Sequence, residues 1–196
     1  MLGISLLFVG IVLTHNGVMF MSKKDGEPLI VQNGKSIAVF NLIVGSLIVL
    51  MNLIWFGTHL PSALASEGAV GLRHIEFQNI AAGFLFGVTY IFIGLNILLK
   101  LDMRPFGWYC LGVAIFALII ATDSFVAFAS GAGIDLLILG ILWILWFPLW
   151  LAGTLEFNLG ITKMGKVFPW MAIVGGIISA FIPAIALLLG WWPLLS

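Results

Sequence analysis

The sequence predicts an all-α integral membrane protein, with six transmembrane helices in a single bundle. Of its 196 residues, 62% are hydrophobic and only 8% are charged, whereas about a quarter of the residues of a soluble domain are charged. The apolar residues also form six continuous runs, each close to the ~20 residues that a helix needs to cross a bilayer. The alternating segments of ~10 residues that are typical of transmembrane β-barrels do not occur.

The six predicted helices occupy most of the chain and leave no stretch for a second domain, so we expect residues 1–196 to form a single transmembrane domain. The first run lacks the basic region and the small-residue cleavage site of a signal peptide, so we expect it to be retained as a helix. The loops between the runs hold nearly all of the charge. The predicted helices are 2–21, 37–56, 79–99, 106–129, 134–156 and 168–192.

The positions of lysine and arginine predict how the chain is oriented. Cytoplasmic loops carry an excess of these residues. Seven of the eight cations lie in the first, third and fifth loops, and only Arg73 lies in the second. The odd-numbered loops should therefore face the cytoplasm, with both termini on the opposite side of the membrane. The seven cations are Lys23, Lys24, Lys35, Lys100, Arg104, Lys163 and Lys166.

Charge and motifs exclude several classes of function. The formal net charge is zero, and there is no cluster of basic residues to neutralise the phosphates of a nucleic acid. The sequence has no GxSxG, HExxH or Walker-type glycine loop, and its three histidines lack the spacing of metal ligands. We therefore expect no enzyme activity, no nucleic-acid partner, no metal and no organic cofactor.

Three tryptophans share one face of the fifth predicted helix. Trp143, Trp146 and Trp150 are three and four residues apart, a spacing that places them on one stripe. They lie toward the middle of the run and not at its end, where tryptophan usually marks the membrane interface. Two interpretations remain open. The stripe either packs against other helices or forms a pore wall, in which each indole offers a flat face and one N–H donor.

A second aromatic stripe lies at a comparable depth on the third predicted helix. Phe86 and Tyr90 are four residues apart on one face. Gly83, Gly87 and Gly94 on the same helix allow close approach to a neighbour. The two aromatic stripes can therefore converge. The Tyr90 hydroxyl can bond to a neighbouring backbone group or face a pore, and the sequence leaves both interpretations open.

Ionisable residues are scarce inside the predicted helices. Asp123 and Glu156 lie near opposite membrane faces, and neither a carboxylate nor a lysine lies near the middle. Proton relays and ion pathways normally contain such groups, so a neutral solute is favoured. His15, Asn16 and Glu156 are candidate polar contributors to a solute path, although a lone histidine beside Asn16 also fits a hydrogen-bonded core residue. The alternatives are a proton-coupled transporter that uses His15, Asp123 or Glu156, and a non-conducting accessory membrane protein.

Five stretches form an ordered set of motifs along nearly the whole chain: the opening MLG with LLFVGIVL, then LFGVTY, DMRPFGWY, WxxWxxxWL, and GKxxPWxAI with AFIPA. This set resembles the bacterial urea and short-chain-amide channel family, which comprises the acid-activated urea channel of gastric bacteria and amide transporters encoded beside aliphatic amidases. The resemblance implies passive conduction of urea or a small amide such as acetamide through each protomer. It also implies a homo-hexamer around membrane lipid, and functional coupling to a cytoplasmic urease or amidase.

The resemblance further implies which residues form the solute path, and it shows two departures. Gastric members carry a glutamate where this chain has Gly175, and their external loops are rich in histidine and carboxylates. Here the external loops offer only His59, Glu67, His74 and Glu76, all in the second loop, so we expect no acid gating. The implied path residues are Leu6, Val9, Leu13, Phe86, Tyr90, Trp143, Trp146, Leu149 and Trp150.

Overall fold

The protein is a bundle of helices, six of which are long and apolar enough to cross a membrane within the described part of the chain. This computed structural model describes residues 2–21, 30, 33–65, 70–161 and 164–192, with backbone alone for 2, 59–65, 70–76 and 164–165. The predicted all-α class with six membrane helices is confirmed. The helices are α1 Leu2–Phe20, α2 Gly34–Ala65, α3 Val70–Leu99, α4 Arg104–Ala129, α5 Ile134–Leu159, α6 Met164–Gly175, the π-helical η1 Gly176–Phe181, and α7 Ile182–Leu188.

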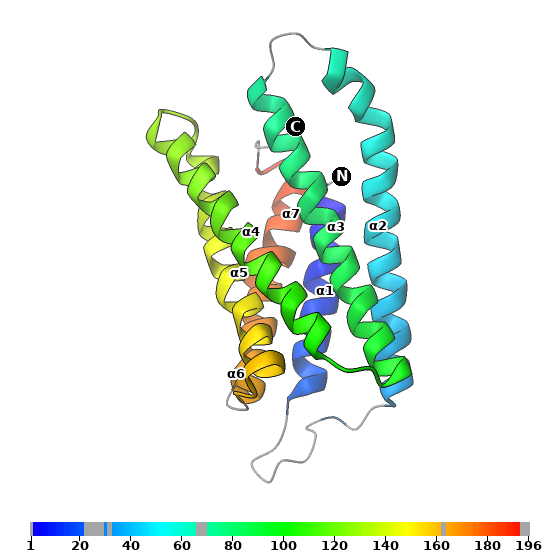
Figure 1. Ribbon diagram of the computed structural model, residues 1–196. Helices are drawn as coiled ribbons and strands as arrows, with labels where there is room; N and C mark the ends of the chain where they lie inside the picture. The colour runs from blue at the N-terminus through cyan, green and yellow to red at the C-terminus, as the bar shows by residue number, and fades with distance from the viewer. Residues whose placement is uncertain (1, 22–29, 31–32, 66–69, 162–163, 193–196) are drawn as a thin grey trace.

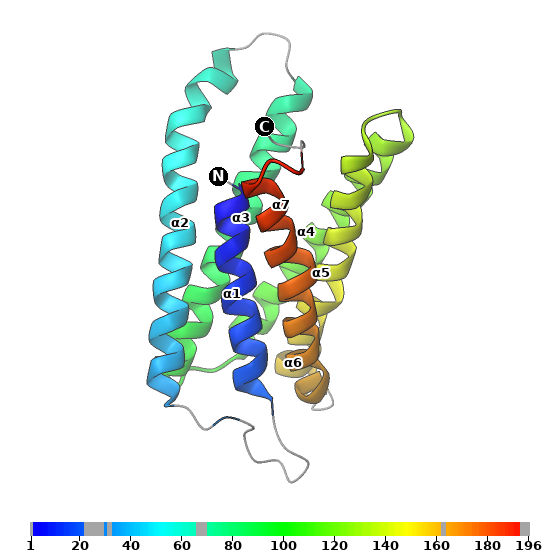
Figure 2. The same ribbon diagram turned by 180° about the vertical axis from the view of Figure 1, so that it is seen from behind.

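Two helical hairpins flank a central pair of rods (Figures 1 and 2). α2 packs against α3 on one side, and α4 packs against α5 on the other. Between them, α1 runs along α6, η1 and α7, which follow one another in a single rod. The start of α1 lies at the same end of the bundle as the end of α7 and the turn between α4 and α5 (Figure 1). Which end faces the cytoplasm stays a prediction.

Small residues bring α2 and α3 into backbone contact. A Cβ atom on Gly45 would lie 2.7 Å from the carbonyl oxygen of Gly87, and one on Gly94 would lie 2.8 Å from the carbonyl oxygen of Ala38. Any side chain at these positions would force the two helices apart. The close approach expected for the glycines of α3 is thus confirmed, and α2 is the helix that uses it.

The prediction of a loop over residues 57–78, between the second and third predicted helices, is wrong. α2 continues to Ala65 and α3 begins at Val70, so most of that stretch is helical. The apolar run indicates only how much of a helix fits the hydrocarbon layer. Once a helix is nucleated, each further residue adds one hydrogen bond, so the backbone continues into the polar region.

The last predicted helix, 168–192, is also not one regular helix. It is divided into α6, η1 and α7, and the helical part ends at Leu188. Pro183 has no N–H, and in a regular α-helix its ring would clash with the carbonyl of Ser179, four residues earlier. The wider π register before the proline relieves this conflict, because the N–H of Ile182 bonds to the carbonyl of Ile177, five residues earlier.

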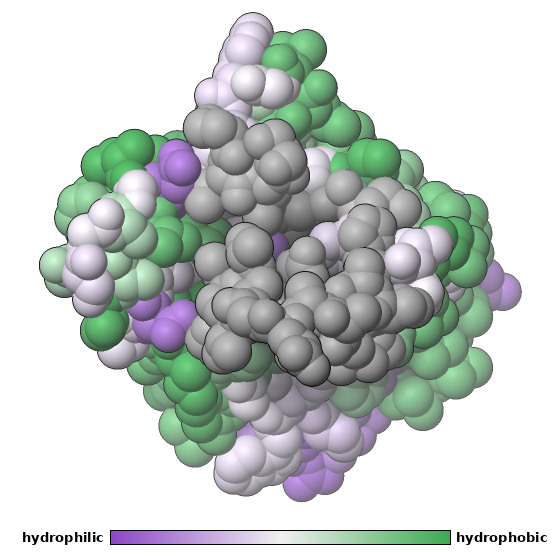
Figure 3. Space-filling view, turned by 90° about the horizontal axis from the view of Figure 1, so that it is seen from above, coloured by the Kyte–Doolittle hydropathy of each residue, from purple (hydrophilic) through white to green (hydrophobic). Residues whose placement is uncertain are grey.

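The outside of the bundle is apolar. Seen from the end of the bundle, hydrophobic side chains occupy most of the rim (Figure 3). Large apolar residues such as Ile119, at 59% exposure, and Trp108, at 66%, face outward. In water such a continuous patch would drive association, so this surface fits a lipid environment.

Candidate functional site

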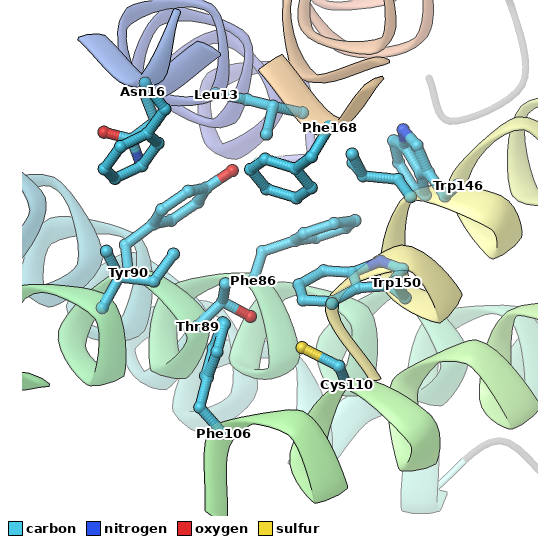
Figure 4. Close-up of a pocket in the computed structure, with 14 residues that line it drawn as sticks. Leu13, Asn16, Phe86, Thr89, Tyr90, Phe106, Cys110, Trp146, Trp150 and Phe168 are labelled. Carbon is cyan, nitrogen blue, oxygen red and sulfur yellow. The ribbon is translucent and has the colours of Figure 1, made fainter. Parts of the chain in front are cut away.

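A cavity of about 40 Å³ lies between α1, α3, α4, α5 and α6, and Figure 4 shows the side chains around it. This volume is roughly three times the ~10–15 Å³ that one water molecule requires, so the cavity can admit water or one small solute. Most of its wall is aromatic or aliphatic. The lining residues are Leu13, Asn16, Phe20, Phe86, Thr89, Tyr90, Ile93, Phe106, Cys110, Trp146, Leu149, Trp150, Gly153 and Phe168.

Phe86 lies among the three tryptophans of α5. Its ring centroid is 4.6 Å from that of Trp146 in an edge-to-face arrangement, 6.2 Å from Trp143 and 6.3 Å from Trp150. Separations of 4.5–7 Å are the favourable range for aromatic pairs. The stripes of α3 and α5 therefore converge at one depth, and they do so at the edge of the cavity.

The indole N–H groups of Trp146 and Trp150 have different surroundings. The Trp146 N–H donates a hydrogen bond to the Ser179 hydroxyl on η1. The Trp150 N–H is buried and has no hydrogen-bond partner among the described residues. A buried donor without a partner costs ~1–3 kcal/mol. Trp150 thus lines the cavity and carries a buried donor whose hydrogen-bonding capacity is unused among the described residues.

The Tyr90 hydroxyl is a second polar group of the cavity wall. Tyr90 is 2% exposed, and Figure 4 shows its oxygen directed toward Phe168 and Leu13 on the far side of the cavity. Its hydroxyl makes no hydrogen bond with another described residue. The interpretation in which a neighbouring backbone group binds this hydroxyl therefore finds no support in the described part of the chain.

Asn16 lines the cavity from α1, and both its amide nitrogen and its amide oxygen are hydrogen-bonded. Its Nδ2 donates to Asn41 Oδ1 on α2 over 2.7 Å, and Asn41 Nδ2 donates back to Asn16 Oδ1 over 2.9 Å. His15 Nδ1 lies 3.3 Å from the same Asn16 oxygen, and the imidazole packs against Phe40 with a centroid separation of 4.6 Å. His15 is half-buried and does not line the cavity, and its role in a solute path stays a prediction.

The structure brings together six of the nine predicted path residues around the cavity. All nine are buried. Leu6 and Val9 lie nearer the start of α1, and Trp143 contacts Phe86 without lining the cavity. Glu156 is half-buried and is not part of the lining. The six are Leu13, Phe86, Tyr90, Trp146, Leu149 and Trp150; a role for any of the nine in conduction stays a prediction.

Sequence reasoning missed the lining residues of α4 and α6. Phe106 and Cys110 are four residues apart on one face of α4, and Phe168 comes from the first half of the last rod. The i, i+4 spacing of Phe106 and Cys110 was a visible signal, but an apolar pair in an apolar helix does not distinguish a cavity wall from a packed contact. Among the described residues no group of three or more His, Cys, Asp or Glu could hold a metal ion.

Comparison with known proteins agrees with this architecture. Residues 1–191 match the model of the AmiS/UreI family of transporters. The acid-activated urea channel of Helicobacter pylori strain 26695 is 37% identical over 98% of this chain and 100% of its own length. A putative amidate substrates transporter protein of Mycolicibacterium smegmatis is 30% identical over 97% of this chain and 78% of its own.

A solved structure shares the fold as well as the sequence. The crystal structure of the urea channel from Helicobacter pylori superposes with a TM-score of 0.77 at 35% identity and covers 98% of this chain and 99% of that one. These relatives are channels and transporters, in agreement with the prediction of a protein that is not an enzyme. With six apolar helices and a match along nearly its entire length, the chain is a multi-pass protein of the bacterial cytoplasmic membrane and belongs to the AmiS/UreI family of transporters.

Proposed function

We propose that the protein is a passive channel for urea or a short-chain amide such as acetamide, and that the solute passes through the aromatic cavity of each protomer. One observation carries the proposal. The cavity wall is mostly apolar, and its other polar side chains, Asn16 and Thr89, are hydrogen-bonded within the protein. The Trp150 N–H and the Tyr90 hydroxyl have no partners among the described residues. The carbonyl of urea or an amide can accept from Trp150, and its N–H can donate to Tyr90.

The chemistry of the lining accounts for selection of a neutral solute. No charged side chain is among the described residues that line the cavity. An ion that enters loses hydration worth many kcal/mol and finds no opposite charge to offset that loss. A small planar amide loses only a few hydrogen bonds, and the two unpartnered groups replace part of them. We infer that the aromatic rings form a slot that selects flat, neutral molecules.

The resemblance to the family and the printed names of the relatives support the wider setting. We propose that the odd-numbered loops face the cytoplasm and that the chain assembles as a homo-hexamer around membrane lipid. A cytoplasmic urease or amidase would consume the solute and keep its gradient inward. The apolar outer surface is large enough to provide both subunit contacts and lipid contacts.

Flux measurements in proteoliposomes test the proposal. We expect urea or acetamide to enter faster than in protein-free liposomes, to stop at equal concentrations, and to be insensitive to a proton uncoupler. Tyr90→Phe tests the role of the hydroxyl in conduction, because it removes that one group and keeps the aromatic ring. Accumulation above the external concentration that an uncoupler abolishes would establish instead the coupled transporter based on His15, Asp123 or Glu156. A rate equal to that of protein-free liposomes would establish the non-conducting accessory protein.

A further inference from the structure

Ser179 occupies the middle of the π-helical segment η1, and its side chain is completely buried. Its hydroxyl makes two hydrogen bonds. It donates to the carbonyl of Gly175, and its oxygen accepts from the Trp146 Nε1–H. A hydroxyl has one proton, and an indole nitrogen can only donate. The bond to Gly175 therefore leaves the lone pairs of the Ser179 oxygen directed at the tryptophan.

The segment that carries Ser179 is held against α1 at backbone distance. A Cβ atom on Gly10 would lie 2.7 Å from the backbone nitrogen of Phe181, and one on Gly176 would lie 2.6 Å from Thr14 Oγ1. Packing this close leaves η1 little freedom to move relative to α1. Single-turn π segments inside helices are frequent at functional sites. Here the segment presents a fixed acceptor to a side chain of another helix.

The hydrogen bond determines which part of Trp146 reaches the cavity. Figure 4 shows the indole nitrogen of Trp146 directed away from Phe86 and Trp150. The ring meets Phe86 edge-to-face, with 4.6 Å between centroids. The polar atom of Trp146 is therefore turned out of the cavity, and its apolar ring is turned toward it.

Trp150, one turn further along α5, differs from Trp146 in its hydrogen bonding. It has the same side chain and also lines the cavity, but its N–H has no partner among the described residues. The two neighbouring tryptophans thus differ in whether the N–H group is bonded within the protein. We propose that Ser179 is a positioning residue that locks the Trp146 ring as the size-limiting wall of the path and so leaves polar recognition to Trp150; this inference rests on the channel function proposed above.

Solute selectivity provides the first test. We expect Ser179→Ala to free the Trp146 ring and lower the ratio of urea flux to propionamide flux in proteoliposomes by roughly threefold to tenfold, the range that one net hydrogen bond supports. Ser179→Thr keeps the hydroxyl and should keep the ratio. Ser124→Ala is the matched control, because Ser124 is also buried and donates to a carbonyl four residues earlier, that of Ile120, without accepting a hydrogen bond from a described tryptophan. A merely structural role for Ser179 would lower the yield of folded protein and leave the ratio unchanged, which would overturn the inference.

A double-mutant cycle tests whether Ser179 acts through Trp146. Trp146→Phe keeps an aromatic ring and removes the indole N–H. In that background Ser179→Ala should alter the flux ratio by less than about 1.5-fold, because the bond no longer exists to be broken. Equal effects of Ser179→Ala in the two backgrounds would show that the serine acts by another route.

A third test does not depend on conduction at all. In wild-type protein with ¹⁵N-labelled indoles, we expect the Trp146 N–H to exchange with solvent deuterium at least tenfold more slowly than the Trp150 N–H, with the signals assigned by Trp146→Phe and Trp150→Phe. If the liposomes conduct no urea or amide, the channel proposal fails while this measurement still decides whether Ser179 holds Trp146. Exchange of the two N–H groups at the same rate would overturn the positioning role even in a conducting channel.

Discussion

Two buried regions of this bundle contain polar side chains, and they differ in whether those side chains are hydrogen-bonded. At the contact between α1 and α2, Asn16 and Asn41 bind each other through both amide groups. At the cavity between α3 and α5, the Tyr90 hydroxyl and the Trp150 N–H have no partner among the described residues. Polar groups buried away from water are normally hydrogen-bonded. The satisfied pair therefore joins two helices, whereas the Tyr90 hydroxyl and the Trp150 N–H remain available to the solute that we propose for the cavity.

The Asn16–Asn41 pair also shows which kind of partner Trp150 and Tyr90 lack among the described residues. An amide offers a carbonyl acceptor and an N–H donor side by side, and these two amides satisfy each other over 2.7 and 2.9 Å. Trp150 and Tyr90 line the cavity and carry an N–H and a hydroxyl that have no such counterpart among the described residues. Urea and short-chain amides are small mobile molecules that carry both a carbonyl acceptor and an N–H donor. The comparison supports the proposed class of solute on grounds that do not depend on family resemblance.

The largest effect should follow from removing the unsatisfied donor. We expect Trp150→Ala to change urea flux or the ratio of urea to acetamide flux by tenfold or more, because it removes both a wall and an N–H of the cavity. Trp191→Ala is the control, since Trp191 is 74% exposed near the end of the chain, and it should alter flux by less than twofold. Stopped-flow light scattering of proteoliposomes measures both. Similar effects at the two positions would mean that the α5 tryptophans only pack the bundle.

A smaller effect should follow from breaking the satisfied pair. Asn41→Leu leaves the Asn16 amide without its partner, so we expect the free energy of unfolding to fall by ~1–2 kcal/mol, within the range for interhelical hydrogen bonds and unpaired buried amides. The double variant Asn16→Leu, Asn41→Leu should recover part of that loss, because it leaves no amide unpaired. Unfolding in mixed micelles with increasing SDS measures the difference. If the free energy of unfolding lost by the double variant equals the sum of the losses for Asn16→Leu and Asn41→Leu, the two amides are not coupled.

The sequence predicted the number of helices and the convergence of the aromatic stripes, because both follow from periodic patterns of residue type. Apolar run length indicates how many times the chain crosses the lipid, and the spacing of Trp146, Trp150, Phe86 and Tyr90 indicates which faces meet. The length of α2 and α3 could not be predicted this way, because helices continue past the lipid. Nor could the role of Ser179 be seen, since a single serine in an apolar run has no pattern, and its partner lies 33 residues away on α5.

A still smaller effect is expected from pH. Turning a channel from nearly closed to nearly open requires ~5.5 kcal/mol, whereas a histidine whose pKa shifts by one unit between two states supplies only ~1.4 kcal/mol. The histidines in the region that the sequence predicts to be external are His59 and His74. Their side chains, like those of Glu67 and Glu76, are not among the side chains that the structure describes. We expect urea flux at pH 5 and pH 7.5 to agree within about threefold. A steep rise in urea flux below pH 6 that disappears in the double variant His59→Ala, His74→Ala would show that this region forms a gate.

The smallest effect should come from the exposed turn between α3 and α4. There Asp102 accepts a hydrogen bond from Arg104 Nε over 2.8 Å, and the side-chain and backbone bonds from Arg104 lower the pKa of the Asp102 carboxyl. Because the pKa of Asp102 is lowered, the ion pair contributes to stability at pH values above the ordinary aspartate pKa of ~3.9. That contribution is lost only as the pH falls through the lowered pKa. Asp102 therefore stays ionised at pH 5 and above. Because the pair is exposed and screened by salt, we expect Asp102→Asn to leave the ratio of flux at pH 5 to flux at pH 7.5 unchanged, and any acid dependence gained or lost in this variant would make the turn a pH sensor.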